Sequence, residues 1–297
     1  MIYSIVMESN TNRIALLKWF YRCKTKRTVE KEPPTPPAKL PLDRETLTDI
    51  VDLALWAGQL LMQNGAESER IEETVHQLGT GLGCDWGDVL VSPNAIIVTH
   101  ISGGEFRTKV RRITKGGVNM TLIAAVSHLT HRVAEGKYDR FGVRAELERI
   151  NSTPRHYNRW VTILAVGLAC AAFSRLFGGD WTIFGITLMA ASGSMFVRQE
   201  LMQRQFNALL VTTAAALSAG LLVGAAKFLS ISSSLETALA ASVLLLVPGV
   251  PFINSVEDLI KGHTVVGLAR GTTGLLIILA IALGLLVAMR LTGVSGL

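Results

Sequence analysis

Residues 241–270 read ASVLLLVPGVPFINSVEDLIKGHTVVGLAR, and this stretch decides how the second half of the chain folds. Its first part is apolar enough for the interior of a membrane, but Pro248, Gly249 and Pro251 interrupt it. Each proline removes a backbone donor and collides with the preceding turn, so the pattern predicts a broken helix. Irregular backbone at membrane depth persists where protein covers it or where it lines a cavity. The alternative is a structural helix with a proline kink.

Polar residues follow the break within a few positions. Asn254 comes about one turn after Pro251, and Glu257, Asp258 and Lys261 come next. Secondary transporters commonly build substrate sites beside interrupted spans, so this position indicates a transport site. The alternative is a polar exit loop at the inner boundary of the membrane, whose charges have no further role.

Charge divides the chain into two parts. Residues 1–159 hold 40 charged side chains, whereas residues 160–297 hold only 12. The first part is therefore expected to be soluble and the second to be a membrane domain. The sequence pI of about 9.4 is explained by basic residues that flank membrane spans, so no nucleic-acid partner is expected. Cys23, Cys84 and Cys170 show neither metal-ligand spacing nor a disulfide framework, and we expect no metal and no cofactor.

Three segments are predicted. Residues 1–42 form a basic, proline-rich tail that we expect to be disordered, with no clear function. Residues 43–151 form an α+β domain with two helices, a small antiparallel sheet and two further helices. Residues 152–297 form an all-α membrane domain with five transmembrane helices. The expected spans are about 160–177, 181–197, 208–226, 238–254 and 271–289.

Periodicity supports the α+β prediction. The apolar positions expected to face the core of the four helices are Leu47, Ile50, Ala54, Ala57 and Leu61; Ile71, Val75, Leu78 and Leu82; Leu122, Val126, Leu129 and Val133; and Val143, Leu147 and Ile150. The period changes to two in residues 89–91, 96–101 and 106–113, which predicts strands. In the last strand Phe106, Thr108 and Val110 alternate with three basic residues.

Basic residues set the expected orientation of the spans. With the first domain inside, six Lys or Arg residues flank the inner ends of the spans and three flank the outer ends. The inner six are Arg155, Arg159, Arg198, Arg204, Lys261 and Arg270, and the outer three are Arg175, Lys227 and Arg290. This excess favours a cytoplasmic N-terminal domain and an external C-terminus. The lack of a secretion signal agrees with this orientation.

Four motifs carry a resemblance to a known family. GAESERIEE (Gly65–Glu73), SPNAIIV (Ser92–Val98), RRITKGGVN (Arg111–Asn119) and LLLVPGVPFINSVEDLIKGH (Leu244–His263), the last with GLAR after it, resemble the threonine/serine exporter family. The resemblance covers roughly residues 43–290. It implies export of small carboxylate metabolites across a bacterial inner membrane, driven by the proton gradient. It implies succinate as the cargo, with threonine or serine as the alternative.

The resemblance also implies a partner and a site. Long members of the family have a soluble domain and ten spans in one chain, so five spans imply a small membrane subunit as partner. The substrate or transport candidates are Pro248, Gly249, Pro251, Asn254, Asp258 and Arg270. The motif residues of the soluble domain are Gly65, Glu67, Ser68, Glu72, Asn94 and Asn119. We expect the hetero-oligomer to form through the broken span and through small-residue faces at Gly220/Gly224, Gly267/Gly271 and Ala280/Gly284/Ala288.

A membrane-tethered hydrolase is the alternative from another class. Glu72 and His76 lie one helical turn apart, which suits an acid–base pair. Ser68, however, lacks a glycine elbow, and no oxyanion-hole motif follows it, so solvated or capping roles are favoured and no enzyme is expected. His128 and His131 are interpreted as surface residues, and Asn119 as a turn and cap residue.

Overall fold

The computed structural model describes residues 41–113, 116–153, 157–227 and 235–293. The expected tail falls almost wholly outside these ranges. The sheet-containing region comprises α2 (Arg44–Gln63), α3 (Ser68–Gly81), β1 (Trp86–Ser92), β2 (Ala95–Ser102), β3 (Glu105–Arg112), α4 (Met120–Ala134) and α5 (Arg140–Ser152). The helical region comprises α6 (Arg159–Leu176), α7 (Trp181–Gln203), α8 (Ala208–Lys227), α9 (Leu235–Val243), the 3₁₀ turn η1 (Leu244–Leu246), α10 (Gly249–Ile260) and α11 (Thr264–Thr292).

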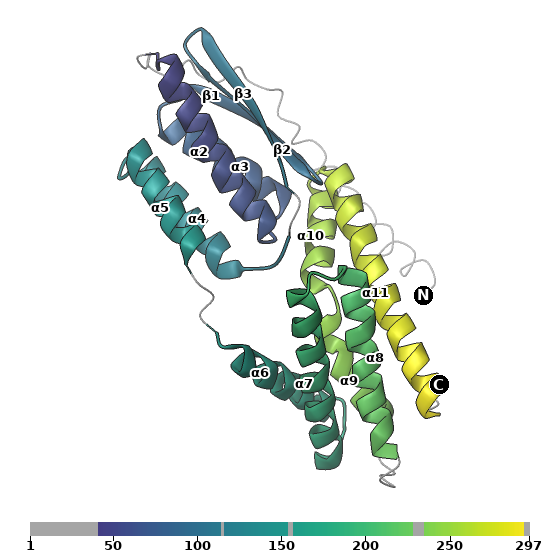
Figure 1. Ribbon diagram of the computed structural model, residues 1–297. Helices are drawn as coiled ribbons and strands as arrows, with labels where there is room; N and C mark the ends of the chain where they lie inside the picture. The colour runs from purple at the N-terminus through teal and green to yellow at the C-terminus, as the bar shows by residue number, and fades with distance from the viewer. Residues whose placement is uncertain (1–40, 114–115, 154–156, 228–234, 294–297) are drawn as a thin grey trace, which may run out of the picture. The chain divides into compact units, whose positions relative to one another are not determined.

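Helices cover one face of a three-stranded antiparallel sheet with strand order β1-β2-β3 (Figure 1). Helix α2 packs against β2 and β3, and α3 packs against β1. The core positions predicted from periodicity are buried, apart from Leu82 and Leu122, which are half-buried. Asn119 caps α4, because its side chain accepts from the backbone N–H of Leu122, so the predicted cap is confirmed. Local patterns therefore account for the element order of this region.

The outer strand β3 presents its apolar side away from the helices. Phe106 and Val110 are 64% and 63% exposed. The basic positions that alternate with them face α2 instead, where Lys109 Nζ lies 2.5 Å from Asp52 Oδ2 and Arg111 donates to Gln59. Polar residues along α2 thus determine which face of β3 is covered.

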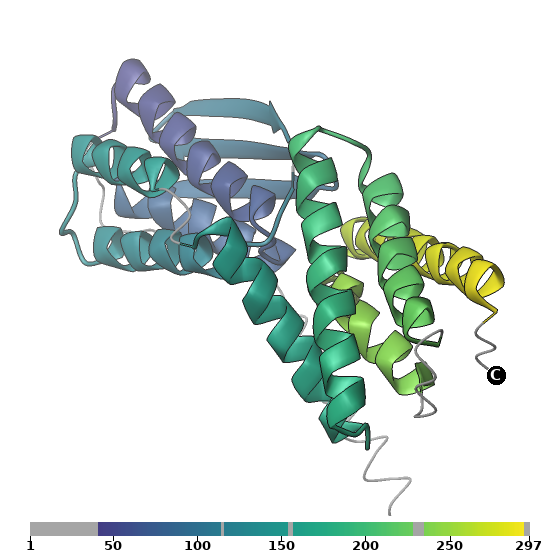
Figure 2. The same ribbon diagram turned by 60° about the horizontal axis from the view of Figure 1, so that its bottom comes forward.

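Helices α6 to α11 pack side by side (Figures 1 and 2). By length and composition α6, α8 and α11 could each cross a membrane, and α9–η1 with α10 would add a fourth span as a bent pair. The expected second span forms the 23-residue helix α7, which is not among these candidates. The protein is therefore mostly helical, with a small sheet and three to four apolar helices in the described residues.

The structure adds detail to two expected spans. The predicted break in the span expected at about 238–254 is a 60° bend between residues 235–246 and residues 249–260, so this stretch is a bent pair and not one straight helix. Asn254, Glu257 and Asp258 consequently lie inside α10 rather than in an exit loop. The last helix begins at Thr264, seven residues before the expected start, which places Arg270 within α11.

The small-residue faces are used inside the chain. A Cβ at Gly267 would lie 2.9 Å from the Ser255 carbonyl oxygen, and one at Gly284 would lie 2.4 Å from the Thr213 carbonyl oxygen. Gly220 faces Ala288 in the same way. These glycines let α11 approach α10 at one end and α8 at the other, so small residues pack the helices of the bundle against one another. Because internal packing occupies them, they do not offer the open face for a partner that was also expected.

Candidate functional site

The polar residues that follow the break meet the loop between α2 and α3. Asn254 Nδ2 donates to the Gly65 carbonyl oxygen at 2.7 Å, and Arg270 Nη2 donates to the Ala66 carbonyl oxygen at 2.9 Å. The backbone N–H of Ser68 donates to Asp258 Oδ1 at 2.9 Å. Two groups of predicted residues, about 190 positions apart in the chain, therefore lie in one place. We call this set of interactions the α3-cap contact.

Glycine is required in the loop at the α3-cap contact. Gly65 has a φ of +90°, in the region where a Cβ causes strain. A side chain here would also crowd the neighbouring segment, since its Cβ would lie 3.2 Å from the Gly117 carbonyl oxygen. The loop can therefore present its carbonyl oxygens to Asn254 and Arg270 only with glycine at this position.

Asp258 supplies the cap of α3 from a distant part of the chain. Its side chain is completely buried, and its carboxylate accepts from Ser68, the first residue of α3. A negative charge is favoured at this end because the first N–H groups of a helix are unpaired and its dipole is positive there. Glu67 occupies the N-cap position but makes no capping bond, and its carboxylate pairs with Arg70 at 2.8 Å. The capping role expected of the motif is thus filled by Asp258.

Asp258 also pairs with Arg270. Arg270 Nη1 lies 3.0 Å from Asp258 Oδ2, and the arginine side chain is only 18% exposed. Both partners are largely out of water, so removal of one leaves a buried charge without compensation, at a cost of about 3–5 kcal/mol. The pair therefore holds the first turns of α11 against α10 and against the loop before α3.

More exposed charges surround this buried centre. Lys261 Nζ lies 2.5 Å from both Glu69 and Glu257, and His263 Nδ1 lies 3.6 Å from Glu72. Partial burial raises the pKa of Glu72, while the nearby His263 opposes that shift. Glu69, Lys261 and His263 were not among the predicted site residues. All three lie inside the two family motifs at Gly65–Glu73 and Leu244–His263, and this position was the sequence signal that could have identified them.

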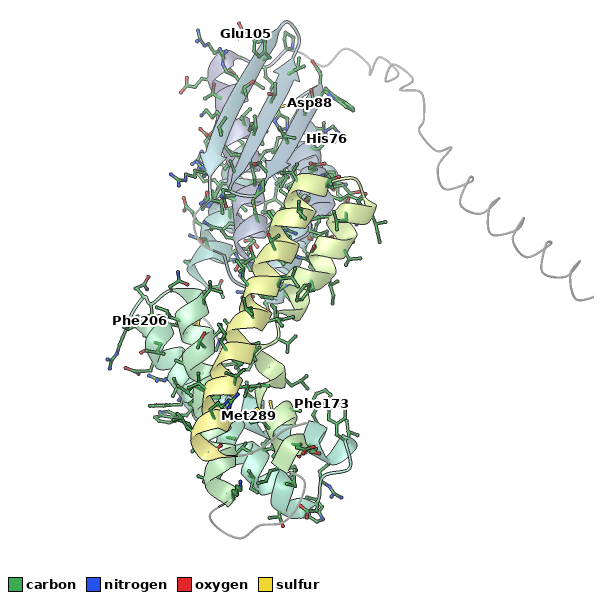
Figure 3. All side chains as sticks on the ribbon, turned by 90° about the vertical axis from the view of Figure 1, so that its right-hand side faces the viewer. His76, Asp88, Glu105, Phe173, Phe206 and Met289 are labelled. Atoms are coloured by element: carbon green, nitrogen blue, oxygen red, sulfur yellow. The ribbon has the colours of Figure 1, made fainter. Side chains whose placement is uncertain are left out.

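The structure does not assemble the hydrolase constellation in its described residues. His76 lies where α3 packs against β1 (Figure 3). Its Nδ1 lies 2.9 Å from the Gly87 carbonyl oxygen, and its ring packs against Trp86, so it does not pair with Glu72. Ser68 is fully buried, so of the two expected roles, solvated or capping, the solvated role is wrong, and its hydroxyl has no hydrogen-bond partner. A buried serine without a neighbouring base cannot act as a nucleophile in this conformation.

Other predicted residues lie away from the α3-cap contact. Asn94 is exposed in the turn between β1 and β2, where its carbonyl oxygen accepts from Ile113. Asn119 caps α4, although its N–H also donates to the Asn64 carbonyl oxygen beside the α3 loop. No cluster of three or more potential metal-binding His, Cys, Asp or Glu side chains occurs within the described ranges.

The prolines form the beginning of α10. Pro248 is its N-cap residue, and Gly249 and Pro251 lie in its first turn. A proline is tolerated there because the N–H groups of a first helical turn have no partner within the helix. The predicted break is confirmed as a 60° bend, which directs α10 along α11 towards the α3-cap contact.

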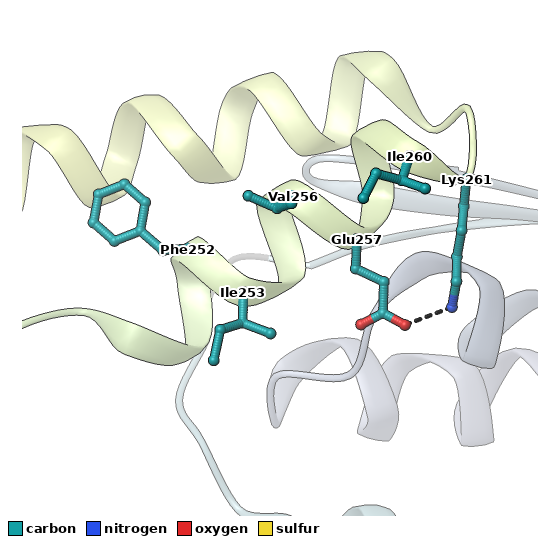
Figure 4. Close-up of a pocket in the computed structure, with 6 residues that line it drawn as sticks. All are labelled: Phe252, Ile253, Val256, Glu257, Ile260 and Lys261. Atoms are coloured by element: carbon teal, nitrogen blue, oxygen red, sulfur yellow. Dashed lines mark hydrogen bonds and ion pairs between the residues drawn. The ribbon is translucent and has the colours of Figure 1, made fainter. Parts of the chain in front are cut away.

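Helix α10 carries an open apolar groove of about 450 Å³ along one side (Figure 4). Its lining residues are Phe252, Ile253, Val256, Glu257, Ile260 and Lys261. Ile253 and Ile260 are 67% and 80% exposed. The chain itself leaves this face of the helix uncovered in the part that the structure describes.

Residues 52–292 match the family model described as "Putative threonine/serine exporter". The chain belongs to this family. It is 38% identical to the "Probable succinate transporter subunit YjjP" of Escherichia coli over 251 residues, which cover 83% of this chain and 96% of that protein. It is 36% identical to the protein of the same description from Klebsiella aerogenes, over 86% of this chain and 98% of that one. No solved structure matches the chain.

Longer members of the family are more distant. The chain is 21% identical to the "Threonine/serine exporter" of Corynebacterium glutamicum over 80% of its own length, but it spans only 50% of that protein. The "Probable threonine/serine exporter" of Mycobacterium tuberculosis is 18% identical over 81% of this chain, which spans 46% of that relative. This chain is thus a transporter of the threonine/serine exporter family, and it corresponds to about half of these two members.

Proposed function

We propose that this chain is the larger subunit of a secondary transporter that exports small carboxylate metabolites, with succinate as the cargo. The observation that carries the proposal is its similarity to proteins described as succinate transporter subunits over nearly their whole length. Threonine or serine is the second candidate cargo, because the more distant relatives are named for it.

The transport candidates would act through the α3-cap contact. Asn254, Asp258 and Arg270 connect the bent pair to the sheet-containing region, with the motif residues Gly65 and Ser68 on the other side. A movement of α10 during transport would therefore displace the loop before α3. We propose that this contact couples the cytoplasmic domain to the broken span at Pro248–Pro251.

The proposed topology has five spans in a bacterial inner membrane, formed by α6, α7, α8, the bent pair and α11. The sheet-containing domain lies in the cytoplasm and the C-terminus in the periplasm, as the distribution of basic residues favours. Within this arrangement the inner end of the bent pair faces the cytoplasmic domain. The proton gradient would supply the driving force.

The proposed partner is a small membrane subunit resembling YjjB. Two observations support it: the curated relatives of similar length are described as subunits, and two exporters of the same family are about twice as long. The groove on α10 is an apolar surface that the described residues leave open and that such a subunit could cover. The small-residue faces are not available for it.

Efflux from cells tests the proposal. Cells that make this chain with its small partner are loaded with labelled succinate, threonine or serine, and release is compared with that from cells that make either subunit alone. We expect succinate release only when both subunits are present. Release of threonine or serine but not succinate would select the second cargo, and release of none of the three would refute the proposed function.

The bend gives a second test of the same function. Replacing both Pro248 and Pro251 by alanine restores two backbone donors and favours a continuous helix. The variant should insert normally and export poorly. Normal export by this variant would show that the bend is only a structural kink.

A further inference from the structure

A small cavity lies where α6, α7, α9 and η1 meet, away from the α3-cap contact; its lining is mostly apolar, with Ser194, Arg198 and Ser242 as the polar residues. Its volume is only about 10 Å³, room for one water molecule. The lining residues are Val166, Ala191, Ser194, Met195, Arg198, Ser242, Leu245 and Leu246. Leu246 immediately precedes the bend, so the cavity borders the broken span.

Arg198 differs from the other arginines of the helical region in having neither an anionic partner nor a fully exposed side chain. Arg159 and Arg204 pair with Glu200, and Arg270 pairs with Asp258. Arg175 donates to the Gly179 carbonyl oxygen, and Arg290 is exposed. Arg198 is half-buried, lines the cavity and makes no ion pair or hydrogen bond with the described residues.

A half-buried guanidinium group without an anionic partner favours the binding of an anion. It cannot lose its charge, and burial without a counter-charge is unfavourable. Its planar fork of donors fits a carboxylate through two parallel hydrogen bonds. Charged groups within membrane segments commonly mark the path of a substrate or ion.

Polar residues continue from Arg198 along one face of α7. Ser194 lies four residues before Arg198 and Thr187 lies eleven before it, so the three share the side of the helix that packs inside the bundle. Thr187 is fully buried, and its hydroxyl has no hydrogen-bond partner. The Ser194 hydroxyl donates to the Ala215 carbonyl oxygen, which leaves its lone pairs free.

We infer that Arg198 binds a carboxylate group of the transported metabolite at the junction of α7, α9 and η1. The inference rests on the proposed function and names the residue that recognises the substrate. At about 10 Å³ the cavity is too small for a metabolite in this conformation, and it must widen by movement at the bend to admit one. The sequence explained Arg198 as a basic residue that flanks a span. That role does not account for the cavity beside Arg198 or for its lack of an anionic partner among the described residues.

Two measurements on the full-length protein test the inference. The first is efflux of labelled succinate from cells that contain both subunits. Arg198→Gln should lower the rate by about tenfold or more, and Arg198→Lys should lower it less, because a lysine keeps the charge but loses the fork. Arg204→Gln is the matched control, since Arg204 ends the same helix but is exposed, and its rate should stay within about twofold.

The second measurement is independent of transport. Succinate should raise the melting temperature of the purified chain in mild detergent, and its uncharged analogue succinamide should not. Arg198→Gln should abolish that rise without changing the melting temperature of the unliganded chain. Serine, which also carries a carboxylate, is tested in parallel.

The outcomes separate the inference from the proposed function. If the wild type exports or binds a carboxylate and Arg198→Gln does so equally well, the inference is wrong while the proposed function stands. If serine replaces succinate in both assays and Arg198→Gln loses it, the inference stands with the second cargo. If the wild type neither exports nor binds any of these compounds, both fail.

Discussion

Arg270 and Arg198 show two opposite uses of the same side chain. Arg270 is surrounded by acceptors: it pairs with a buried carboxylate and donates to the Ala66 carbonyl oxygen. Arg198 borders a cavity and has no such acceptor among the described residues. An arginine with all its partners inside the protein stabilises a contact, whereas one without them is free to recognise a ligand. By this comparison, Arg270 stabilises the fold at the α3-cap contact, and Arg198 is the arginine that we infer to bind the substrate at the cavity.

The strongest test of this division removes Asp258. Asp258→Ala leaves Arg270 without its counter-charge and the N–H of Ser68 without an acceptor. We expect the free energy of unfolding to fall by about 3–5 kcal/mol, as measured by chemical or thermal unfolding in detergent. Glu257→Ala, one residue away, removes only an exposed ion pair and should cost less than about 1 kcal/mol. Equal losses for the two variants would contradict the assignment.

His100 is also buried, but unlike an arginine its side chain can lose its charge. The His100 side chain is fully buried, and its ring lies so close to Gly79 that a Cβ there would be 1.7 Å from Nε2. Burial lowers the pKa of His100 to about 4, so the folded protein holds it neutral. The unfolded chain binds this proton near pH 6.5, and the folded state is therefore fully stable only above that pH.

Acidification should consequently destabilise the sheet-containing region. Between about pH 6.5 and pH 4 the loss from His100 is at most about 3 kcal/mol. This loss is measured by comparing the melting temperatures of the full chain and of its His100→Gln variant across this pH range. The variant should show a weaker dependence on pH. If both proteins respond alike, other groups cause the acid sensitivity.

Lysine substitutions compare the two arginines directly. Arg270→Lys cannot maintain both the pair with Asp258 and the bond to Ala66, so it should lower stability by about 1–2 kcal/mol. Arg198→Lys breaks no contact and should leave the melting temperature unchanged in the absence of ligand. A loss of stability at Arg198 equal to that at Arg270 would show that both are structural.

The smallest effect is expected at the edge of the α3-cap contact. Lys261 pairs with Glu69 and Glu257, but all three side chains are partly exposed. Lys261→Met should therefore change the free energy of unfolding by less than about 1 kcal/mol. The difference should shrink further in high salt, because ions screen exposed charges. A loss comparable to that of Asp258→Ala would place Lys261 in the structural centre.

Local sequence patterns predicted the elements well for a physical reason. The repeat of Leu47, Ile50 and Ala54 marks the face of a helix that must be buried, and Asn119 offers its own cap within three residues. Similarly, the two prolines predicted an interruption without reference to anything else in the fold. Each of these signals acts over a few residues.

The partners across the α3-cap contact could not be predicted in this way. Glu67 occupies the local position for a cap, but a buried carboxylate 190 residues after Ser68 fills that role. Sequence alone also did not show which face of β3 is covered, because alternation of Phe106 and Arg107 fits either side. The family motifs identified Gly65 and Asp258 separately, and only the structure brings them together.

The length of α11 has a mechanical consequence. Its 29 residues form one continuous helix, fixed near its start by Arg270 and close to α8 at its end, where Lys227 Nζ donates to the Gly293 carbonyl oxygen (Figure 3). The distance from Arg270 to the end of the helix at Thr292 is about 33 Å at 1.5 Å per residue. Pivoting such a rod by about 5° moves its far end by about 3 Å. A small rotation of α11 about the α3 loop would therefore be amplified at its far end. Such a rotation would either break the hydrogen bond between Lys227 and Gly293 or move α8 together with α11.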